Sequence, residues 1–274
     1  MTAICLTGDL HHQSLATGNQ RAADDTEIRL AARYLRMLEE ARVKVTFFVS
    51  GKSFVEQWPE LAPICASELV ELGGHNWSCF DPALPHRVWN QLTGSYNGPV
   101  VWQRRDVART IEVAWHRAGR RLRSWRNHMY KHAPTTNGVL ARAGIRVVSD
   151  GVRATAAAPT RQPEGVWSFP INVLPDHEHL YHAERTPASV AAWVRRHRWS
   201  DDFGSGSYHV EEWTDRVVEQ VLAHRAAGRI ANLIIHPITL YLADRWRSFR
   251  RILDVLAASP TAWISELVPA EERP

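Results

Sequence analysis

The sequence predicts an α/β protein with a mainly parallel sheet or barrel. Short apolar runs alternate with longer helix-like stretches along the 274 residues, as repeated strand–helix units do. Several of these apolar runs end in acidic, basic or histidine side chains, which is typical of active sites at the carboxyl ends of parallel strands. The chain is 45% hydrophobic and 23% charged, as ordinary globular proteins are. We expect a single domain over residues 1–274, because α/β barrels of roughly 200–250 residues form one domain.

The expected strands are short apolar or β-branched runs that end at turn residues. The clearest is Val-Lys-Val-Thr-Phe-Phe-Val at residues 43–49, which ends at Ser50 and Gly51. The expected strands in chain order are 3–6, 43–49, 69–72, 122–125, 145–150, 166–174, 231–235 and 262–265.

The expected helices lie between these strands. The first begins near Asp24, an N-cap residue type followed three residues later by Glu27. Gly144 marks the end of another. The expected helices are 24–41, 58–67, 103–118, 137–143, 189–198, 209–227 and 244–258. Residues 90–99, with two glycines and a proline, are expected to form a long loop, as are residues 154–164.

Charge and cysteine content exclude several classes of protein. The net charge is +4, with the arginines scattered or in pairs, so no nucleic-acid partner is expected; a solvated basic surface, with a mouth favouring anions, explains the balance. The chain has three cysteines, and this odd number argues against a disulfide framework. No apolar run could cross a bilayer and no secretion signal is recognisable, so no membrane partner is expected and we expect a cytoplasmic protein. The sequence is compatible with a homo-oligomer.

Two segments that follow predicted strands carry metal-ligand side chains. Asp9 and His11 are two residues apart and share a face if the first strand persists. His75 and Cys79 share a helical face if the chain turns helical after Gly74. Carboxylate, imidazole and thiolate groups are the ligands of catalytic zinc. Turn, cap or core roles for Asp9 and Cys79 are the alternative.

Further polar residues also follow predicted strands. Arg126, Asp150 and His236 each come at such an end, so they could converge on the same mouth as the first two segments. His177 and His179 could reach this mouth from an extended segment, as substrate contacts or a second metal site, although exposed loop histidines are commoner.

These motifs, in this order, resemble the polysaccharide deacetylase family, also called the NodB homology domain or carbohydrate esterase family 4. The most specific part is Thr-Phe-Phe at 46–48 followed by Glu-Leu-Gly-Gly-His at 71–75. Trp-Arg at 125–126 and Leu-Ile-Ile-His-Pro at 233–237 follow in the family's order. The resemblance implies a distorted parallel (β/α) barrel and a divalent metal.

The resemblance also implies roles for individual residues. Asp9 corresponds to the general base, His236 to the general acid, Arg126 to the arginine that orients the base, and His75 to the first metal histidine.

This chain departs from the family at its metal ligands. His11 is the available ligand where the family has a second aspartate, and Cys79 stands at the second metal histidine. The expected metal set is therefore His11, His75 and Cys79, with zinc the expected ion. His128 replaces the proline of the family's Arg-x-Pro pattern.

The favoured function is metal-dependent removal of an acetyl or formyl group from the nitrogen of an amino sugar or related small molecule. The expected substrate contacts are His128, Tyr130, Asp150, His177 and His179. One alternative is a member without metal that binds a carbohydrate or nucleotide. Another is a non-haem Fe(II) oxygenase that uses Asp9, His11 and His75 as a two-histidine, one-carboxylate set.

Overall fold

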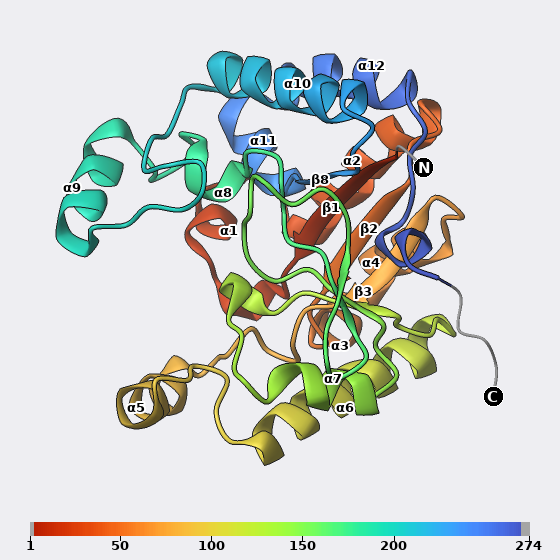
Figure 1. The fold of residues 1–274 in the computed structure, drawn as a ribbon, viewed down its shortest axis with the longest axis vertical. Helices are drawn as coiled ribbons and strands as arrows, with labels where there is room; N and C mark the ends of the chain where they lie inside the picture. The colour runs from red at the N-terminus through yellow and green to blue at the C-terminus, as the bar shows by residue number, and fades with distance from the viewer. Residues whose placement is uncertain (1–2, 270–274) are drawn as a thin grey trace.

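The computed structural model describes residues 3–269 and builds them around one curled sheet (Figure 1). The strand order is β6-β7-β5-β4-β3-β2-β1-β8, and all neighbouring pairs are parallel except β6 and β7. The strands are β1 Ile4–Leu10, β2 Val45–Val49, β3 Val70–Gly74, β4 Ser124–Trp125, β5 Val147–Val148, β6 Thr160–Arg161, β7 Trp167–Ser168 and β8 Ala231–Ile234. The predicted α/β class and distorted parallel (β/α) barrel are confirmed, with the eight strands curled into a half-barrel.

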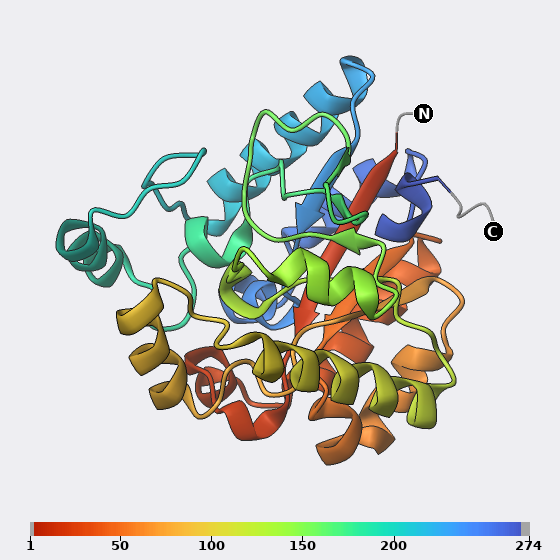
Figure 2. The same cartoon turned by 60° about the horizontal axis from the view of Figure 1, so that its bottom comes forward.

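Helices surround the sheet (Figure 2). α10 and α12 run near β8, whereas α6 and α7 lie at the opposite side of the molecule (Figure 1). The helices are α1 Gly18–Ala22, α2 Glu27–Glu40, α3 Ser53–Glu56, α4 Trp58–Ala66, α5 Ala83–Thr93, α6 Val100–Ala118, α7 Thr136–Arg142, α8 Asp176–His179, α9 Pro187–His197, α10 Val210–Ala226, α11 Pro237–Asp244 and α12 Phe249–Ala257. Within residues 3–269, no helix combines the length and apolar character needed to cross a membrane.

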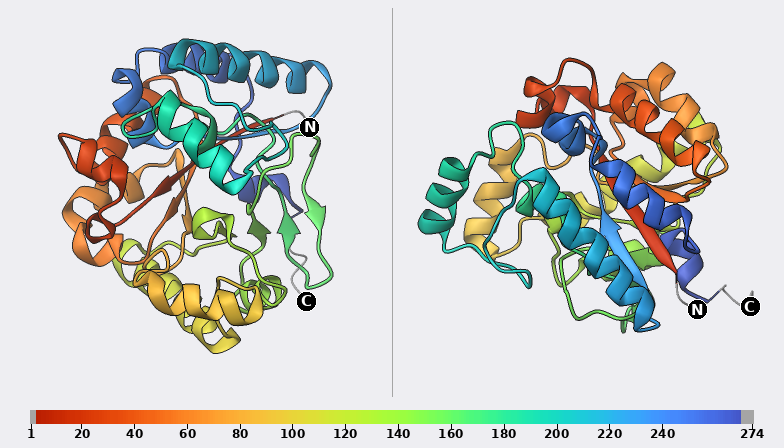
Figure 3. Two further views of the ribbon diagram at one scale, coloured as in Figure 1. Left: turned by 90° about the vertical axis from the view of Figure 1, so that its left-hand side faces the viewer. Right: turned by 90° about the horizontal axis from the view of Figure 1, so that it is seen from above.

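The register of the central strands aligns their carboxyl ends. β1 pairs with β2 on one side and β8 on the other, and all seven of its residues are buried. Asp9 of β1 lies opposite Phe48 of β2, which in turn lies opposite Gly73 of β3. Because the three strands end together, the residues that follow them emerge at one edge of the sheet. In Figure 3 (left), α9 passes in front of the sheet and α5 lies below it.

Several predicted boundaries are wrong. The helix expected to begin near Asp24 is α2. It is capped not by Asp24 but by Thr26, whose side chain accepts from the Arg29 N–H. Residues 83–93 form α5, so the loop expected at 90–99 is reduced to residues 94–99. Leu84, Val88 and Leu92 share one face of α5, but all three side chains are exposed. The helix expected at 244–258 is broken, because Arg245 and Trp246 adopt positive φ between α11 and α12.

The last expected strand is also wrong. Residues 264–267 form a 3₁₀ helix, and only Thr261 bridges to Ile4. The Glu266 side chain accepts from the Trp263 N–H and thereby caps this turn, so local hydrogen bonds override the apolar pattern. By contrast, the expectation of no disulfide framework is confirmed for the described residues, since Cys5, Cys65 and Cys79 are all free and buried.

Gly74, at the end of β3, leaves no room for a side chain. A Cβ there would lie 2.2 Å from two ring carbons of Trp125, which is fully buried. We expect Gly74→Ala to lower the free energy of unfolding by ~1–3 kcal/mol through overpacking, measured by urea denaturation. Gly138→Ala is the matched control, because its Cβ would meet only Glu164 Cγ at 4.0 Å in α7. Equal stability of the two variants would contradict this prediction.

Candidate active site

The ends of four strands bring the predicted catalytic residues together. Asp9 lies near the end of β1, and His75 follows β3. Arg126 follows β4, and His236 comes shortly after β8. All four side chains are buried. The convergence predicted from parallel strand ends therefore occurs for these residues.

Arg126 is fully buried and holds Asp9 in place. Its Nη1 donates to Asp9 Oδ1 at 2.9 Å. Its Nη2 donates to Thr7 Oγ1 at 3.0 Å and to Ser149 Oγ at 2.8 Å, while Nε donates to the Ser149 carbonyl at 3.0 Å. The guanidinium also lies 4.3 Å from the centre of the Phe48 ring. One face and three nitrogens are thus engaged, so the orientation of Asp9 is fixed by a rigid donor.

Asp9 and His236 form a carboxylate–imidazolium pair. Burial alone would raise the pKa of Asp9, but the charge of Arg126 and the hydrogen bond and charge of His236 hold it well below its usual range. Burial alone would lower the pKa of His236, but Asp176 and Asp9 hold it well above its usual value. His236 Nε2 lies 3.6 Å from Asp9 Oδ2. At neutral pH Asp9 is therefore an ionised carboxylate and His236 a protonated imidazolium, the forms from which a base and an acid act.

Asp176 positions His236, a role that the sequence did not predict for it. One carboxylate oxygen accepts from the His236 backbone N–H at 2.7 Å, and the other accepts from His236 Nδ1 at 2.8 Å. Asp176 is completely buried at the start of α8. The backbone and ring contacts together direct Nε2 of His236 towards Asp9.

We expect Asp176→Asn to shift the alkaline limb of the pH dependence of kcat/KM to lower pH. The negative charge of Asp176 raises the pKa of His236, so its loss lowers that pKa and the imidazolium is deprotonated earlier as pH rises. The measurement is the pH profile of kcat/KM. Asp215→Asn, an exposed change on α10, is the control, and an unmoved limb in Asp176→Asn would refute the role.

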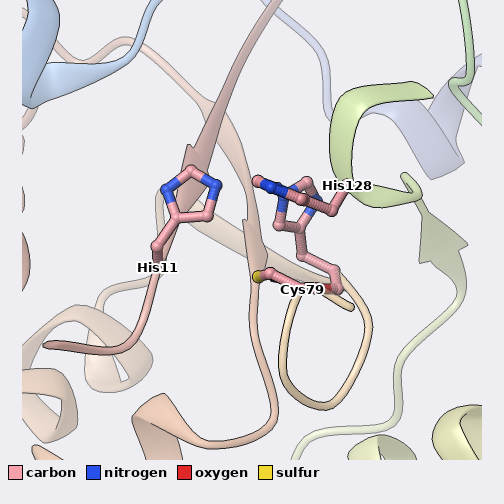
Figure 4. A group of neighbouring side chains, drawn as sticks. His11, Cys79 and His128 are labelled. Carbon is pink, nitrogen blue, oxygen red and sulfur yellow. Dashed lines mark hydrogen bonds between the residues drawn. The ribbon is translucent and has the colours of Figure 1, made fainter. Parts of the chain in front are cut away.

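Four side chains gather beside this pair, with potential ligand atoms within 4.8 Å of one another (Figure 4). They are His11, His75, Cys79 and His128. In Figure 4 His11 faces His128 across the centre of the group, with Cys79 below them. The sequence predicted the first three as metal ligands and His128 as a substrate contact, so the structure adds a fourth donor.

Two of the imidazoles are arranged as metal-binding histidines are. His75 Nδ1 donates to the Arg126 carbonyl at 2.9 Å. His11 Nδ1 donates to Glu27 Oε1 at 2.8 Å. Because the carbonyl carries no hydrogen, the His75 ring keeps its proton on Nδ1 and leaves the Nε2 lone pair for another partner. The His11 ring contacts Glu27 through Nδ1, so its Nε2 is also directed away from that partner. An outer carbonyl or carboxylate of this kind is the usual support of a metal-bound histidine.

The protonation states also fit a divalent cation. Burial lowers the pKa of His75 to about 3, and burial with the neighbouring His11 and His75 holds the pKa of His128 well below its usual value. Neutral imidazoles are the form that binds metal. Burial raises the pKa of the Cys79 thiol, which donates to the His75 carbonyl at 3.7 Å. The histidines therefore form a ready donor set, and Cys79 would join it by losing its proton.

A tight loop, not a helix, brings Cys79 beside His75, so the helical spacing argument is wrong. Asn76, Cys79 and Phe80 all adopt positive φ after β3. Asp106 anchors the loop by accepting from the Trp77 N–H at 2.9 Å. The four-residue separation correctly placed Cys79 beside His75, but the helix on which that prediction relied does not form.

A cavity of about 310 Å³ opens from this centre and receives only some of the expected substrate contacts. Tyr130 and His177 line it, together with Asp9, His11, His128 and His236. Asp150 does not, because its carboxylate accepts from the Asn127 backbone and side chain and pairs with His132. His179 also lies outside the cavity, since its ring bonds the Gly206 carbonyl and Asp201.

The fold and the site together define the class of protein. The chain has the polysaccharide deacetylase fold, and the predicted resemblance is confirmed as a divergent one. Family models give no match to the sequence, and neither do curated proteins.

Individual solved structures show the same architecture. A protein assigned as a polysaccharide deacetylase from Mycobacterium smegmatis aligns with a TM-score of 0.68 at 16% identity, over 100% of this chain and 95% of that one. The Puue allantoinase aligns with a TM-score of 0.66 at 11% identity, over 96% and 86%. A family 4 acetyl xylan esterase from Clostridium thermocellum, solved with a cobalt ion, aligns with a TM-score of 0.50 at 16% identity, over 97% and 90%.

Proposed function

We propose that the protein is a metal-dependent amide hydrolase that removes an acetyl or formyl group from the nitrogen of an amino sugar or a related small molecule. The observation that carries the proposal is the buried Asp9–His236 pair beside three imidazoles. A base, an acid and a cation-binding group at one end of a cavity are the parts that amide hydrolysis requires.

The residues that would hold the cation are His11, His75 and His128, with Cys79 as a fourth donor. Nitrogen and sulfur donors favour zinc among common divalent ions. When bound, the cation would polarise the acyl carbonyl and lower the pKa of a water molecule.

The chain's own residues would move the protons. Asp9 accepts a proton from the attacking water through Oδ2, because Oδ1 is held by Arg126. His236 donates its Nε2 proton to the nitrogen as the C–N bond breaks, so an amine and a carboxylic acid leave. Asp176 stabilises the imidazolium until that step. Each well-placed acid or base contributes roughly 10²–10⁴-fold to the rate.

The size and shape of the cavity support a small substrate. Its volume of about 310 Å³ lies at the lower end of the range for small-molecule sites. The 3₁₀ turn His128–Tyr130 forms one wall and the segment after α8 forms the other.

The oxygenase alternative is less well supported by the geometry. Asp9 lies outside the four-residue ligand group, and its Oδ1 is held by Arg126. A two-histidine, one-carboxylate site would need that carboxylate to face the metal.

The proposal is tested by amine release from N-acetyl and N-formyl amino sugars and amino acids, with zinc- or cobalt-loaded protein. We expect turnover of at least one of these amides, abolished in His236→Asn but retained in His197→Asn, a change on the outer helix α9. Binding of an N-acetyl compound without turnover in the loaded protein would instead establish the binding-protein alternative.

A further inference from the structure

The cavity wall opposite the metal-binding group is built by α8 and by a tight turn at residues 182–185. The turn closes through a hydrogen bond from the Arg185 N–H to the His182 carbonyl at 2.7 Å, with Ala183 at positive φ. His177, Glu178, His182, Glu184 and Arg185 all line the cavity from this side. The reaction proposed above uses none of them.

Arg185 brings to this wall a positive charge that has no carboxylate partner among the described residues, although its guanidinium lies 5.9 Å from the centre of the Trp193 ring. Its Nη2 donates to the Glu178 carbonyl at 2.6 Å, which fastens the turn to α8. Its Nε is buried and has no hydrogen-bond partner. Across residues 3–269, no carboxylate forms an ion pair with its guanidinium. A buried donor on a charged group is costly to leave unpaired, so the arrangement points to an acceptor that enters with the substrate.

Glu178 does not neutralise that charge. Its Oε2 is buried without a hydrogen-bond partner, and burial raises its pKa to about 7. Much of the Glu178 population is therefore the neutral acid near neutral pH, which can donate one hydrogen bond. Glu184, the other acid on this wall, is exposed and lies against Gly18 on the far side of the opening.

The wall begins beside the general acid. The His177 ring lies 5.6 Å from the His236 ring and 6.0 Å from the His182 ring, measured between centroids. His236 protonates the leaving nitrogen in the proposed reaction, so the amine portion of the substrate extends from His236 along His177 towards Arg185.

We propose that Arg185 binds an anionic group, a carboxylate or a phosphate, on the amine portion of the substrate and so determines specificity. This inference rests on the proposed amide hydrolysis. The planar fork of arginine matches both anions, and the Glu178 acid can donate to the same oxygen atoms. The excess of basic residues, with a net charge of +4, favours the approach of such a substrate.

The test compares matched anionic and neutral amides with the metal-loaded protein. N-acetylglucosamine 6-phosphate is paired with N-acetylglucosamine, and N-acetylalanine with N-acetylalaninamide. We expect one anionic member to exceed its neutral partner roughly tenfold or more in kcat/KM. Arg185→Gln should remove that preference through KM with little change in kcat, and Arg185→Lys should restore part of it. Arg225→Gln, an exposed change on α10, is the matched control.

The outcomes separate this inference from the proposed function. Hydrolysis without preference for either anion, or a preference that survives in Arg185→Gln, would overturn the inference and leave amide hydrolysis standing. The phosphate and carboxylate pairs identify which anion is used. Calorimetric binding of glucosamine 6-phosphate, glucosamine, alanine and alaninamide decides the matter without turnover: equal binding within both pairs would overturn the inference, and tighter anion binding lost in Arg185→Gln would support it.

Discussion

Replacing Asp9 by asparagine is expected to lower kcat by ~10²–10⁴-fold while the metal stays bound. The amide cannot accept the proton of the attacking water, whereas the four side chains of the metal-binding group remain unchanged. The measurement is the rate of amine release, with metal content determined on the same preparation. Activity close to that of the wild type would show that another residue is the base.

The same substitution should also destabilise the fold, because Arg126 is completely buried and loses its charged partner. Breaking a buried ion pair costs up to ~3–5 kcal/mol. Activity must therefore be measured below the unfolding transition of the variant. Glu212→Gln, which removes an exposed partner of Arg216 on α10, controls for the change from acid to amide and should keep full activity.

His75→Ala is expected to abolish metal binding. His75 offers its Nε2 to the metal-binding group while Nδ1 is held by the Arg126 carbonyl. Elemental analysis of protein purified without chelators should find about one zinc per chain in the wild type and almost none in the variant. Cys65→Ala removes a buried thiol outside the site and should retain the metal.

Other results of that analysis would redirect the interpretation. Iron in place of zinc would favour the oxygenase alternative. Wild-type protein that takes up no metal, even after soaking with zinc, would refute the metal-dependent proposal and leave a binding protein or a metal-free catalyst.

The sequence could predict the sheet and the convergence of strand ends because both depend on local patterns. The Val-Thr-Phe-Phe-Val run of β2 is buried along its whole length, as its composition indicates. Residues directly after parallel strands share one edge of the sheet, so the meeting of Asp9, His75, Arg126 and His236 followed from their positions alone.

The rest depends on contacts between residues far apart in the chain. His128 enters the metal-binding group because the backbone after β4 turns through Met129 and Tyr130 at positive φ, which no periodic pattern encodes. Asp176 reaches His236 from 60 residues away. Its position at the start of a four-residue helix resembles an ordinary cap. Asp150 follows a strand as expected, but its carboxylate is hydrogen-bonded to its neighbours Asn127 and His132.

Arg126 does more than hold Asp9 in place. Its guanidinium binds Asp9 and its carbonyl accepts from His75, so a single residue connects the Asp9 carboxylate to an imidazole of the metal-binding group. The separation between those two groups is therefore set within one residue and does not depend on the loops that form the mouth. The turn at residues 182–185 can therefore differ without changing the distance between the Asp9 carboxylate and the His75 ring.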